Sequence, residues 1–335
     1  MIKVGIIGMG MRGNFYAKAV KYNAYAEVIA FSEKNSKSLE EAKNEFCIDG
    51  YSDYNQMLEE KKIDLVIIAL PDHMHKEATL KVASKKINLL IEKPLATSLD
   101  DAKVMVSAIK KEGIKAMVAF ENRWNPVFVS AKESLNTKEI INIQLMNGCL
   151  CCKLIFPSKM ISWASKTTVA CCLSTHIIDV ALWLSTKKVL SVYATGQKNI
   201  LSGMGIDTYD SITATLKFKD GTVGTFFSSW IYPNSTPLMY DLRLEMLGSN
   251  GAIKIDCRDQ MIHKITDIYS HPPILGSDIY GKPVGFTAEM LNSFIDNIRE
   301  DTKPLVDIDE GLYVVKIIDT IHRSIISGKV EEVID

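Results

Sequence analysis

Three glycines near the N-terminus have the spacing of a phosphate-binding loop. Gly8, Gly10 and Gly13 follow a short apolar segment and precede a run with helical character. A phosphate can approach the backbone closely where no Cβ intrudes, and the next helix N-terminus offers unpaired N–H groups and a favourable dipole. Glycines also form ordinary tight turns, but a strand before the motif and a helix after it favour a dinucleotide site. That site would include Met11 and Arg12.

An acidic residue at the end of the second predicted strand bears on the choice of nucleotide. Glu33 follows Gly13 by 20 residues, where a carboxylate accepts hydrogen bonds from the ribose hydroxyls and repels a 2′-phosphate. The residue therefore favours NAD over NADP. Lys34 and Lys37 weaken this preference, because either ammonium could pair with a 2′-phosphate, although surface lysines are more often simply solvated.

A polar cluster with two histidines follows the predicted strand 64–69, at the sheet edge where ligands bind in open α/β folds. The cluster is Pro71-Asp72-His73-Met74-His75. Asp72 could equally cap the next helix, and for His73 a ligand role and a plain structural role are evenly matched. No metal-ligand spacing accompanies these histidines, so we expect no metal.

A lysine comes directly after another predicted strand, 87–91, in the segment Glu92-Lys93-Pro94. At the mouth of the crevice, Lys93 can polarise a hydroxyl or carbonyl, or relay its proton, if burial and neighbouring groups favour the neutral amine. A solvated surface lysine is the common alternative. The position at a strand end favours a functional role.

A histidine and an aspartate share one face of an apolar helix in the second half of the chain. His176 and Asp179 are three positions apart. A buried hydrogen bond between them could be purely structural, but imidazole is also well suited to accept a proton near neutral pH.

An indole face stacks on the apolar side of a pyranose, although a tryptophan can equally be core. Candidates for the wall of a substrate site are Asn122, Arg123, Trp124 and Trp163, and we also expect Cys172, His176 and Asp179 to bind substrate.

The elements that must position these residues fall into two patterns. Up to residue 121, short apolar strands alternate with helices, which predicts a parallel sheet covered on both faces. Afterwards, alternating segments predict a mostly antiparallel sheet with accompanying helices and an Asp-Gly hairpin turn at 219–222. We therefore predict an α/β protein with a nucleotide-binding domain at 1–121 and a substrate-binding domain at 122–335.

Composition excludes several other classes of protein. The 335 residues carry 39 Lys and Arg against 40 Asp and Glu, a net charge of −1, which offers no basic field for nucleic acid. The longest apolar stretch, 171–184, is interrupted by His176 and Asp179 and is too short to span a membrane. Seven cysteines form an odd set without zinc spacing, and no export signal is visible. We expect a cytoplasmic protein without metal, nucleic acid or membrane partners.

Five motifs in order resemble the Gfo/Idh/MocA oxidoreductase family, which is related to glucose-fructose oxidoreductase and inositol 2-dehydrogenase. They are Gly8-Met9-Gly10-Met11-Arg12-Gly13, Pro71-Asp72-His73-Met74-His75, Glu92-Lys93-Pro94-Leu95-Ala96, Asn122-Arg123-Trp124-Asn125-Pro126 and His176-Ile177-Ile178-Asp179. Later segments, including 244–251, are similar too, so the resemblance covers nearly the whole chain.

The resemblance implies a cofactor, a catalytic pair and an oligomer. The first domain would be a doubly wound Rossmann domain that binds NAD or NADP. The second would be an α/β domain whose large, open, mostly antiparallel sheet forms a homodimer or homotetramer. Lys93 would take the place of the catalytic lysine, with a cis Lys93–Pro94 peptide, and His176 that of the histidine that contacts or deprotonates the substrate hydroxyl. Residues expected on the nicotinamide side of the cofactor are Pro71, His75 and Glu92.

One departure from the family pattern concerns the substrate site. Many relatives carry an acidic residue four positions before the histidine, where this chain has Cys172, and the stretch 166–170 is also altered. The predicted function is NAD(P)-dependent oxidation of a secondary alcohol in a sugar, cyclitol or derivative. Two alternatives stay open: a glycosidase that retains NAD and uses transient oxidation, and a nucleotide-binding regulatory protein with weak or no turnover.

Overall fold

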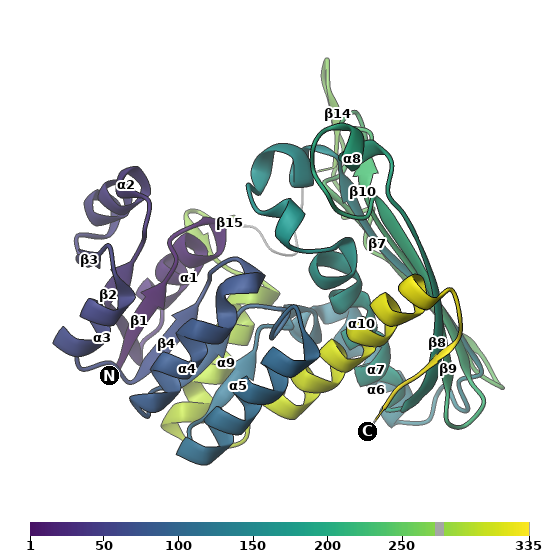
Figure 1. Ribbon diagram of the computed structural model, residues 1–335, viewed down its shortest axis with the longest axis horizontal. Helices are drawn as coiled ribbons and strands as arrows, with labels where there is room; N and C mark the ends of the chain where they lie inside the picture. The colour runs from purple at the N-terminus through teal and green to yellow at the C-terminus, as the bar shows by residue number, and fades with distance from the viewer. Residues whose placement is uncertain (272–277, 335) are drawn as a thin grey trace. The chain divides into compact units, whose positions relative to one another are not determined.

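The chain forms two compact units, which Figure 1 shows in ribbon form. The computed structural model describes residues 1–271 and 278–334. The first unit comprises Met1–Glu121 and Gly276–Leu312, and the second Asn122–Leu275 and Tyr313–Asp335. The return of the chain to the first unit is a feature that the sequence pattern did not predict.

The first unit contains a six-stranded sheet in the order β3-β2-β1-β4-β5-β6, and every neighbouring pair is parallel. This order is that of the Rossmann fold, and the crevice where ligands bind opens where it reverses, between β1 and β4. The central strand β4 is an unbroken apolar run because both of its faces are covered. The strands are β1 (Ile2–Ile7), β2 (Ala26–Ser32), β3 (Asp49–Tyr51), β4 (Leu65–Ile68), β5 (Asn88–Ile91) and β6 (Ala116–Val118).

Helices connect and cover these strands, as the sequence predicted. Asn35 and Ser98 cap the N-termini of α2 and α5 by accepting hydrogen bonds from Ser38 N and Asp101 N, and Gly113 ends α5 with a φ of +65°. The helices are α1 (Met11–Lys21), α2 (Ser36–Phe46), α3 (Tyr54–Glu60), η1 (Asp72–Met74), α4 (His75–Ser84) and α5 (Leu99–Glu112).

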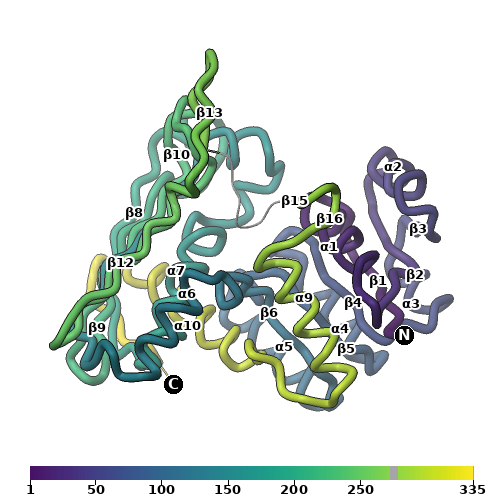
Figure 2. The backbone as a smooth tube through the Cα atoms, turned by 180° about the vertical axis from the view of Figure 1, so that it is seen from behind, coloured from purple at the N-terminus to yellow at the C-terminus, as the bar shows by residue number. Residues whose placement is uncertain are grey.

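Helix α9 (Phe286–Arg299) belongs to the first unit and packs on α1, as Figure 2 shows from behind. Met290, Leu291 and Phe294 on α9 are fully buried. Asn23 Nδ2, just after α1, donates to Asn292 Oδ1 at 2.8 Å. The apolar face of α9 thus completes the core of the nucleotide-binding unit. Two short strands, β15 (Asp278–Ile279) and β16 (Lys282–Pro283), precede it.

The second unit contains a seven-stranded mixed sheet in the order β12-β11-β7-β10-β9-β8-β17. Within this sheet, β7 and β10 form the only parallel pair among the strands that the structure describes, so the predicted mostly antiparallel sheet is confirmed. The predicted turn at 219–222 joins β9 to β10, with Gly221 at a φ of +91°. The strands are β7 (Leu145–Lys153), β8 (Val189–Gln197), β9 (Ser211–Phe218), β10 (Val223–Tyr232), β11 (Tyr240–Leu247), β12 (Ala252–Asp256) and β17 (Glu331–Glu332).

Helices cover one face of this sheet. A Cβ at Gly148 on β7 would lie 2.9 Å from Ile177 on α7, and Ser324 Oγ on α10 accepts from Ala194 N on β8 at 2.9 Å. On the opposite face, side chains such as Tyr193 and Thr213 are exposed. The remaining elements are η2 (Glu121–Trp124), α6 (Pro126–Asn136), η3 (Phe156–Met160), η4 (Ala164–Lys166), η5 (Ala170–Ser174), α7 (Thr175–Ser185), α8 (Ile200–Gly203), β13 (Lys264–Ile265), β14 (Tyr269–Ser270) and α10 (Ile308–Ser327), which begins in the first unit.

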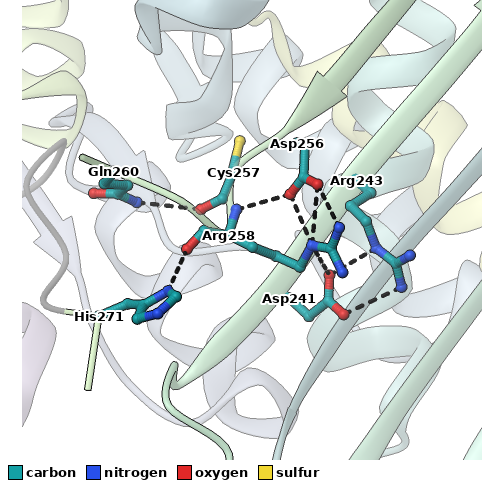
Figure 3. A network of polar contacts seen from close by, with 7 residues as sticks. All are labelled: Asp241, Arg243, Asp256, Cys257, Arg258, Gln260 and His271. Atoms are coloured by element: carbon teal, nitrogen blue, oxygen red, sulfur yellow. Dashed lines mark hydrogen bonds and ion pairs between the residues drawn. The ribbon is translucent and has the colours of Figure 1, made fainter. Parts of the chain in front are cut away.

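A network of alternating charges ties the end of β12 to the sheet (Figure 3). Arg243 Nε donates to Asp241 Oδ1 at 2.8 Å, and Arg258 Nε donates to Asp256 Oδ1 at 2.9 Å. His271 Nδ1 lies 3.1 Å from the Arg258 carbonyl oxygen, which joins the β13–β14 hairpin to the same network.

None of the helices in the described part of the chain has the length and apolarity that crossing a membrane requires.

Candidate active site

The glycine loop leaves open backbone at the N-terminus of α1. Gly8 has a φ of +93°, and a Cβ there would lie 2.7 Å from the Ala69 carbonyl oxygen. A Cβ at Gly13 would lie 1.9 Å from the Gly8 carbonyl oxygen, so both positions require glycine. A Cβ at Gly10 would meet nothing within 4 Å. No side chain caps α1, which leaves its first N–H groups available to an anion, and this arrangement fits a dinucleotide pyrophosphate.

The carboxylate of Glu33 is held against this loop. Its Oε2 accepts from Met9 N at 2.8 Å, and its Oε1 accepts from Asn35 N at 2.8 Å. Because each carboxylate oxygen can accept more than one hydrogen bond, Glu33 keeps capacity for ribose hydroxyls. Lys34 and Lys37 are both exposed, and Lys37 Nζ lies 3.9 Å from Glu41 Oε1. Glu33 is thus the charge that the structure holds in place at this site.

Arg12 points its guanidinium at two buried carboxylates. Its Nε donates to Glu92 Oε1 at 2.9 Å, and its Nη2 lies 3.4 Å from Glu121 Oε1. Burial acts to lower the pKa of Arg12, but the carboxylates of Glu92 and Glu121 raise it by more, so the net shift is upward. The predicted contact of Arg12 and Met11 with the cofactor stays a prediction, and the side chain of Met11 is exposed.

Tyr16 joins the same carboxylate, and the sequence reasoning did not single it out. Its hydroxyl donates to Glu92 Oε1 at 2.6 Å, and its side chain is fully buried. Burial is the main cause that raises the pKa of Tyr16 well above its usual range, and the negative charge of Glu92 is the next. The phenol therefore stays protonated. The signal was present in the spacing, because Arg12 and Tyr16 are four residues apart and share one face of α1.

Lys93 follows β5, and its peptide bond to Pro94 is cis, as the resemblance predicted. The Lys93 side chain is half-buried. His75 is fully buried, with Nδ1 2.9 Å from the Pro94 carbonyl oxygen and Nε2 3.0 Å from the Leu70 carbonyl oxygen. His75 therefore connects the ends of β4 and β5 through backbone atoms.

The other residues of the predicted nicotinamide side differ in exposure. Pro71 is half-buried at the start of η1, whereas Glu92 is only 6% exposed. Asp72 accepts from His73 N through its Oδ1 at 2.8 Å within η1. Contact of Pro71, His75 and Glu92 with the cofactor stays a prediction.

In the second unit, Arg123 and Asp179 form a buried bidentate ion pair. Arg123 Nη2 donates to Asp179 Oδ1 at 2.7 Å and Nε to Oδ2 at 3.2 Å, and the two side chains are 3% and 1% exposed. The pair joins η2 to α7, and Lys132 Nζ on α6 donates to the Trp183 carbonyl oxygen at 2.7 Å. Both residues were predicted to bind substrate, but their short contacts with each other anchor α7.

The other predicted substrate residues belong to the second unit and lie in η2, η5 and α7 and just before η4. His176 is half-buried, one helical turn before Asp179, and Cys172 is buried in η5. Trp124 and Trp163 are half-buried, and Asn122 is buried in η2. Lys93 belongs to the first unit and His176 to the second.

His322 on α10 is a second residue that the sequence reasoning missed. Its Nε2 lies 2.9 Å from Thr168 Oγ1, in the altered stretch 166–170, and Cys172 N donates to the Thr168 carbonyl oxygen at 2.9 Å. Burial lowers the pKa of His322, so the ring is neutral near neutral pH. The loop before the predicted histidine base is thus held by a C-terminal helix of the same unit.

Family models match both parts of the chain. Residues 2–120 match the model described as an oxidoreductase family with an NAD-binding Rossmann fold, and residues 128–254 match the GFO/IDH/MocA C-terminal domain. The chain belongs to the Gfo/Idh/MocA oxidoreductase family. As a member of this family, it is an NAD-dependent oxidoreductase, and the glycine loop with Glu33 fits the cofactor.

Several named dehydrogenases are similar to this chain over most of their length. Scyllo-inositol 2-dehydrogenase (NAD(+)) of Bacillus subtilis is 26% identical over 259 residues, covering 76% of this chain and 73% of the relative. Myo-inositol 2-dehydrogenase of Thermotoga maritima is 23% identical over 320 residues, covering 92% of each. A solved structure of scyllo-inositol dehydrogenase from Lactobacillus casei, with bound NAD(H) and scyllo-inositol, has a TM-score of 0.86, 18% identity and 99% coverage of both chains. This last likeness shows the fold.

Proposed function

We propose that the chain catalyses NAD-dependent oxidation of a secondary alcohol in a cyclitol or a related sugar. The observation that carries the proposal is the position of Lys93, which follows β5 and is linked through Glu92 to Arg12 of the glycine loop. A lysine at this edge of the sheet lies where a ligand bound in the crevice would present its reacting group. The named inositol dehydrogenases among the relatives support the substrate class.

The proposed chemistry gives the bound cofactor and each candidate residue a separate role. NAD⁺, when bound, supplies the hydride acceptor. The side-chain nitrogen of Lys93 accepts or relays the proton of the substrate hydroxyl, and the imidazole of His176 assists. Glu33 and the N–H groups at the start of α1 hold the nucleotide, which fixes where the alcohol carbon must be placed. In this proposal Asn122, Trp124 and Trp163 line the substrate wall, and Cys172 replaces a charged group with a neutral one, so the preferred cyclitol or sugar differs from that of relatives with an acid there.

The direct test is a screen of inositol isomers, sugars and sugar acids with NAD⁺ and with NADP⁺, following the absorbance of the reduced nucleotide. We expect steady NADH formation with a cyclitol or sugar that has a free secondary hydroxyl. Product release without net NADH, from protein that retains NAD, would indicate a glycosidase that oxidises transiently. Nucleotide binding without turnover of any alcohol would indicate a regulatory protein. Either result would contradict the proposal.

The variant Glu33→Gln is expected to relax the preference for NADH. The amide keeps the size of the side chain but loses the charge that repels a 2′-phosphate, and a single carbonyl oxygen replaces two acceptors for Met9 N and Asn35 N. A hydrogen bond from a ribose hydroxyl to the charged carboxylate contributes about 1.5–3 kcal/mol. Its loss should therefore raise the Kd for NADH at least about tenfold. Titration of intrinsic fluorescence with NADH and NADPH measures both affinities.

The matched control is Glu41→Gln, which removes an exposed carboxylate on α2 near Lys37. Its two nucleotide affinities should stay within about twofold of those of the unaltered protein. An unchanged ratio of NADH to NADPH affinity in Glu33→Gln would show that Glu33 does not determine the choice of cofactor.

We also propose a homodimer or homotetramer formed through the exposed face of the second-unit sheet. The support is that helices cover one face only, while Tyr193 and Thr213 are exposed on the other. A bulky cation at Thr213, in the middle strands of the sheet, should disrupt a two-fold contact, because the charge would face its own copy. We expect Thr213→Arg to lower the mass found by light scattering, whereas Ser107→Arg on α5 should not. Equal masses for the unaltered protein and Thr213→Arg would refute this interface.

A further inference from the structure

We infer that Tyr16 is a positioning residue for Lys93 and that it acts through the carboxylate of Glu92. The inference rests on the proposed function, because it assumes that Lys93 handles the substrate proton. Tyr16 lies on α1, its side chain is fully buried, and its hydroxyl donates to Glu92 Oε1 at 2.6 Å. Tyr16 itself is too deeply buried to meet a substrate, so any effect on turnover must pass through its partner.

The carboxylate of Glu92 divides its oxygens between two elements. Oε1 accepts from the Tyr16 hydroxyl at 2.6 Å and from Arg12 Nε at 2.9 Å, both on α1. Oε2 accepts from the backbone N–H of Lys93 at 3.2 Å. Hydrogen bonds to an ionised carboxylate are short and about twice as strong as neutral ones. Glu92 therefore transmits the position of α1, which carries the nucleotide loop, to the backbone of Lys93.

The segment after Glu92 is also held from the other side. The Pro94 carbonyl oxygen lies 2.9 Å from His75 Nδ1, and His75 is itself fully buried. The backbone around Lys93 is thus fixed before and after the residue. Because a lysine has a long flexible stem, the place of its ammonium group depends on where this backbone is held. A displacement of about 1 Å can reduce a rate about a hundredfold.

The hydroxyl of Tyr16 is an ideal group to remove, because phenylalanine has the same ring. In Tyr16→Phe, Glu92 Oε1 keeps Arg12 but loses its shorter donor. The carboxylate can then turn toward Arg12 and release Lys93 N. Because the pKa of Tyr16 lies well above its usual range, the hydroxyl donates throughout an assay from about pH 6 to about pH 9. The effect of the variant should therefore be the same at every pH in that interval.

The experiment compares Tyr16→Phe with Tyr51→Phe in the full-length protein. Tyr51 is a matched control because its hydroxyl donates to a different carboxylate, Glu60 Oε2, at 3.1 Å. We expect Tyr16→Phe to lower kcat about tenfold, with KM for the alcohol and Kd for NADH within about twofold, and Tyr51→Phe to change none of them. A kcat within about twofold of the unaltered protein would overturn the inference.

A double-mutant cycle separates action through Glu92 from general weakening of the fold. In a Glu92→Gln background, Tyr16→Phe should lower kcat by less than about twofold, because the partner through which it acts has already changed. Independent effects that multiply would overturn the inference. Unfolding by urea, measured on the same variants, shows whether any loss of kcat follows stability instead.

A readout without turnover keeps this inference distinct from the proposed function. An amine-reactive acylating reagent, followed by peptide mass analysis, gives the modification rate of Lys93 relative to an exposed lysine such as Lys110. We expect Tyr16→Phe to change this ratio by more than about threefold, even if no alcohol is oxidised. An unchanged ratio would overturn the inference, whereas failure of every alcohol in the unaltered protein would overturn only the proposed function.

Discussion

The variant Lys93→Ala is expected to bind NADH with nearly unaltered affinity and to oxidise its substrate about a thousandfold more slowly. A positioned proton acceptor contributes about 10²–10⁴ to a rate, and alanine removes the amine without altering the glycine loop or Glu33. The loss should appear in kcat and in kcat/KM alike, because proton transfer takes place in the transition state and contributes little to ground-state binding. Stopped-flow measurement of NADH formation at saturating substrate gives the comparison.

Two controls make this result specific. Lys110→Ala removes an exposed lysine that is paired with Asp309, and its kcat should be unaltered. Small primary amines added to Lys93→Ala should restore part of the rate, because they return a proton acceptor of the same kind to the vacated position. Turnover of Lys93→Ala within about twofold of the unaltered protein would exclude Lys93 as the proton acceptor.

The sequence predicted the strand ends well because they depend on local chemistry. Gly8 adopts a positive φ and Gly13 meets the carbonyl oxygen of Gly8, so both have a local reason to be glycine, although Gly8 also lies against Ala69. Glu33 and Lys93 come at the ends of apolar strands whose parallel order brings these ends to one edge. The cis peptide before Pro94 came from the resemblance. These features need no knowledge of which distant side chains meet.

The contacts of those residues were beyond the sequence. Arg12 meets Glu92 across 80 positions, and Tyr16 meets the same carboxylate across 76. The sequence places the carboxylate of Glu92 next to Lys93, and the resemblance assigned Glu92 to the cofactor. In the structure, both carboxylate oxygens of Glu92 accept hydrogen bonds from the protein itself. Which partner a buried charge takes is decided by packing between elements, and a single sequence does not carry that information.

Strand β7 shows another limit of sequence patterns. The alternation that identifies a half-exposed strand is missing there, because Cys149, Leu150, Cys151 and Cys152 are all buried. On one face the strand meets helix α7, through Gly148 and Ile177, and on the other Arg243 and Asp241 lie beside Cys149 and Cys151. A strand that is buried on both faces has no alternation of apolar and polar residues, so the sequence of β7 does not show which of its residues face the helices.

The variant Asp179→Ala is expected to destabilise the second unit by about 3–5 kcal/mol, because it leaves the guanidinium of Arg123 buried without its bidentate partner. All four tryptophans, at 124, 163, 183 and 230, lie in this unit, so the shift of their fluorescence in urea reports its unfolding. The control is Asp207→Ala, which breaks an exposed pair with Lys198 in the same unit and should change stability by about 0–1 kcal/mol.

The double variant Arg123→Met with Asp179→Leu separates the loss of a contact from the penalty of a buried guanidinium whose carboxylate has been removed. Replacing both partners with apolar side chains removes the pair without leaving either charge behind, so most of the stability lost in Asp179→Ala should return. Activity should not return with it if the pair orients α7, since His176 is one helical turn from Asp179 and depends on the same anchor to η2. Recovery of both stability and kcat would show that the ion pair has no part in positioning His176, and that any well-packed contact between η2 and α7 suffices.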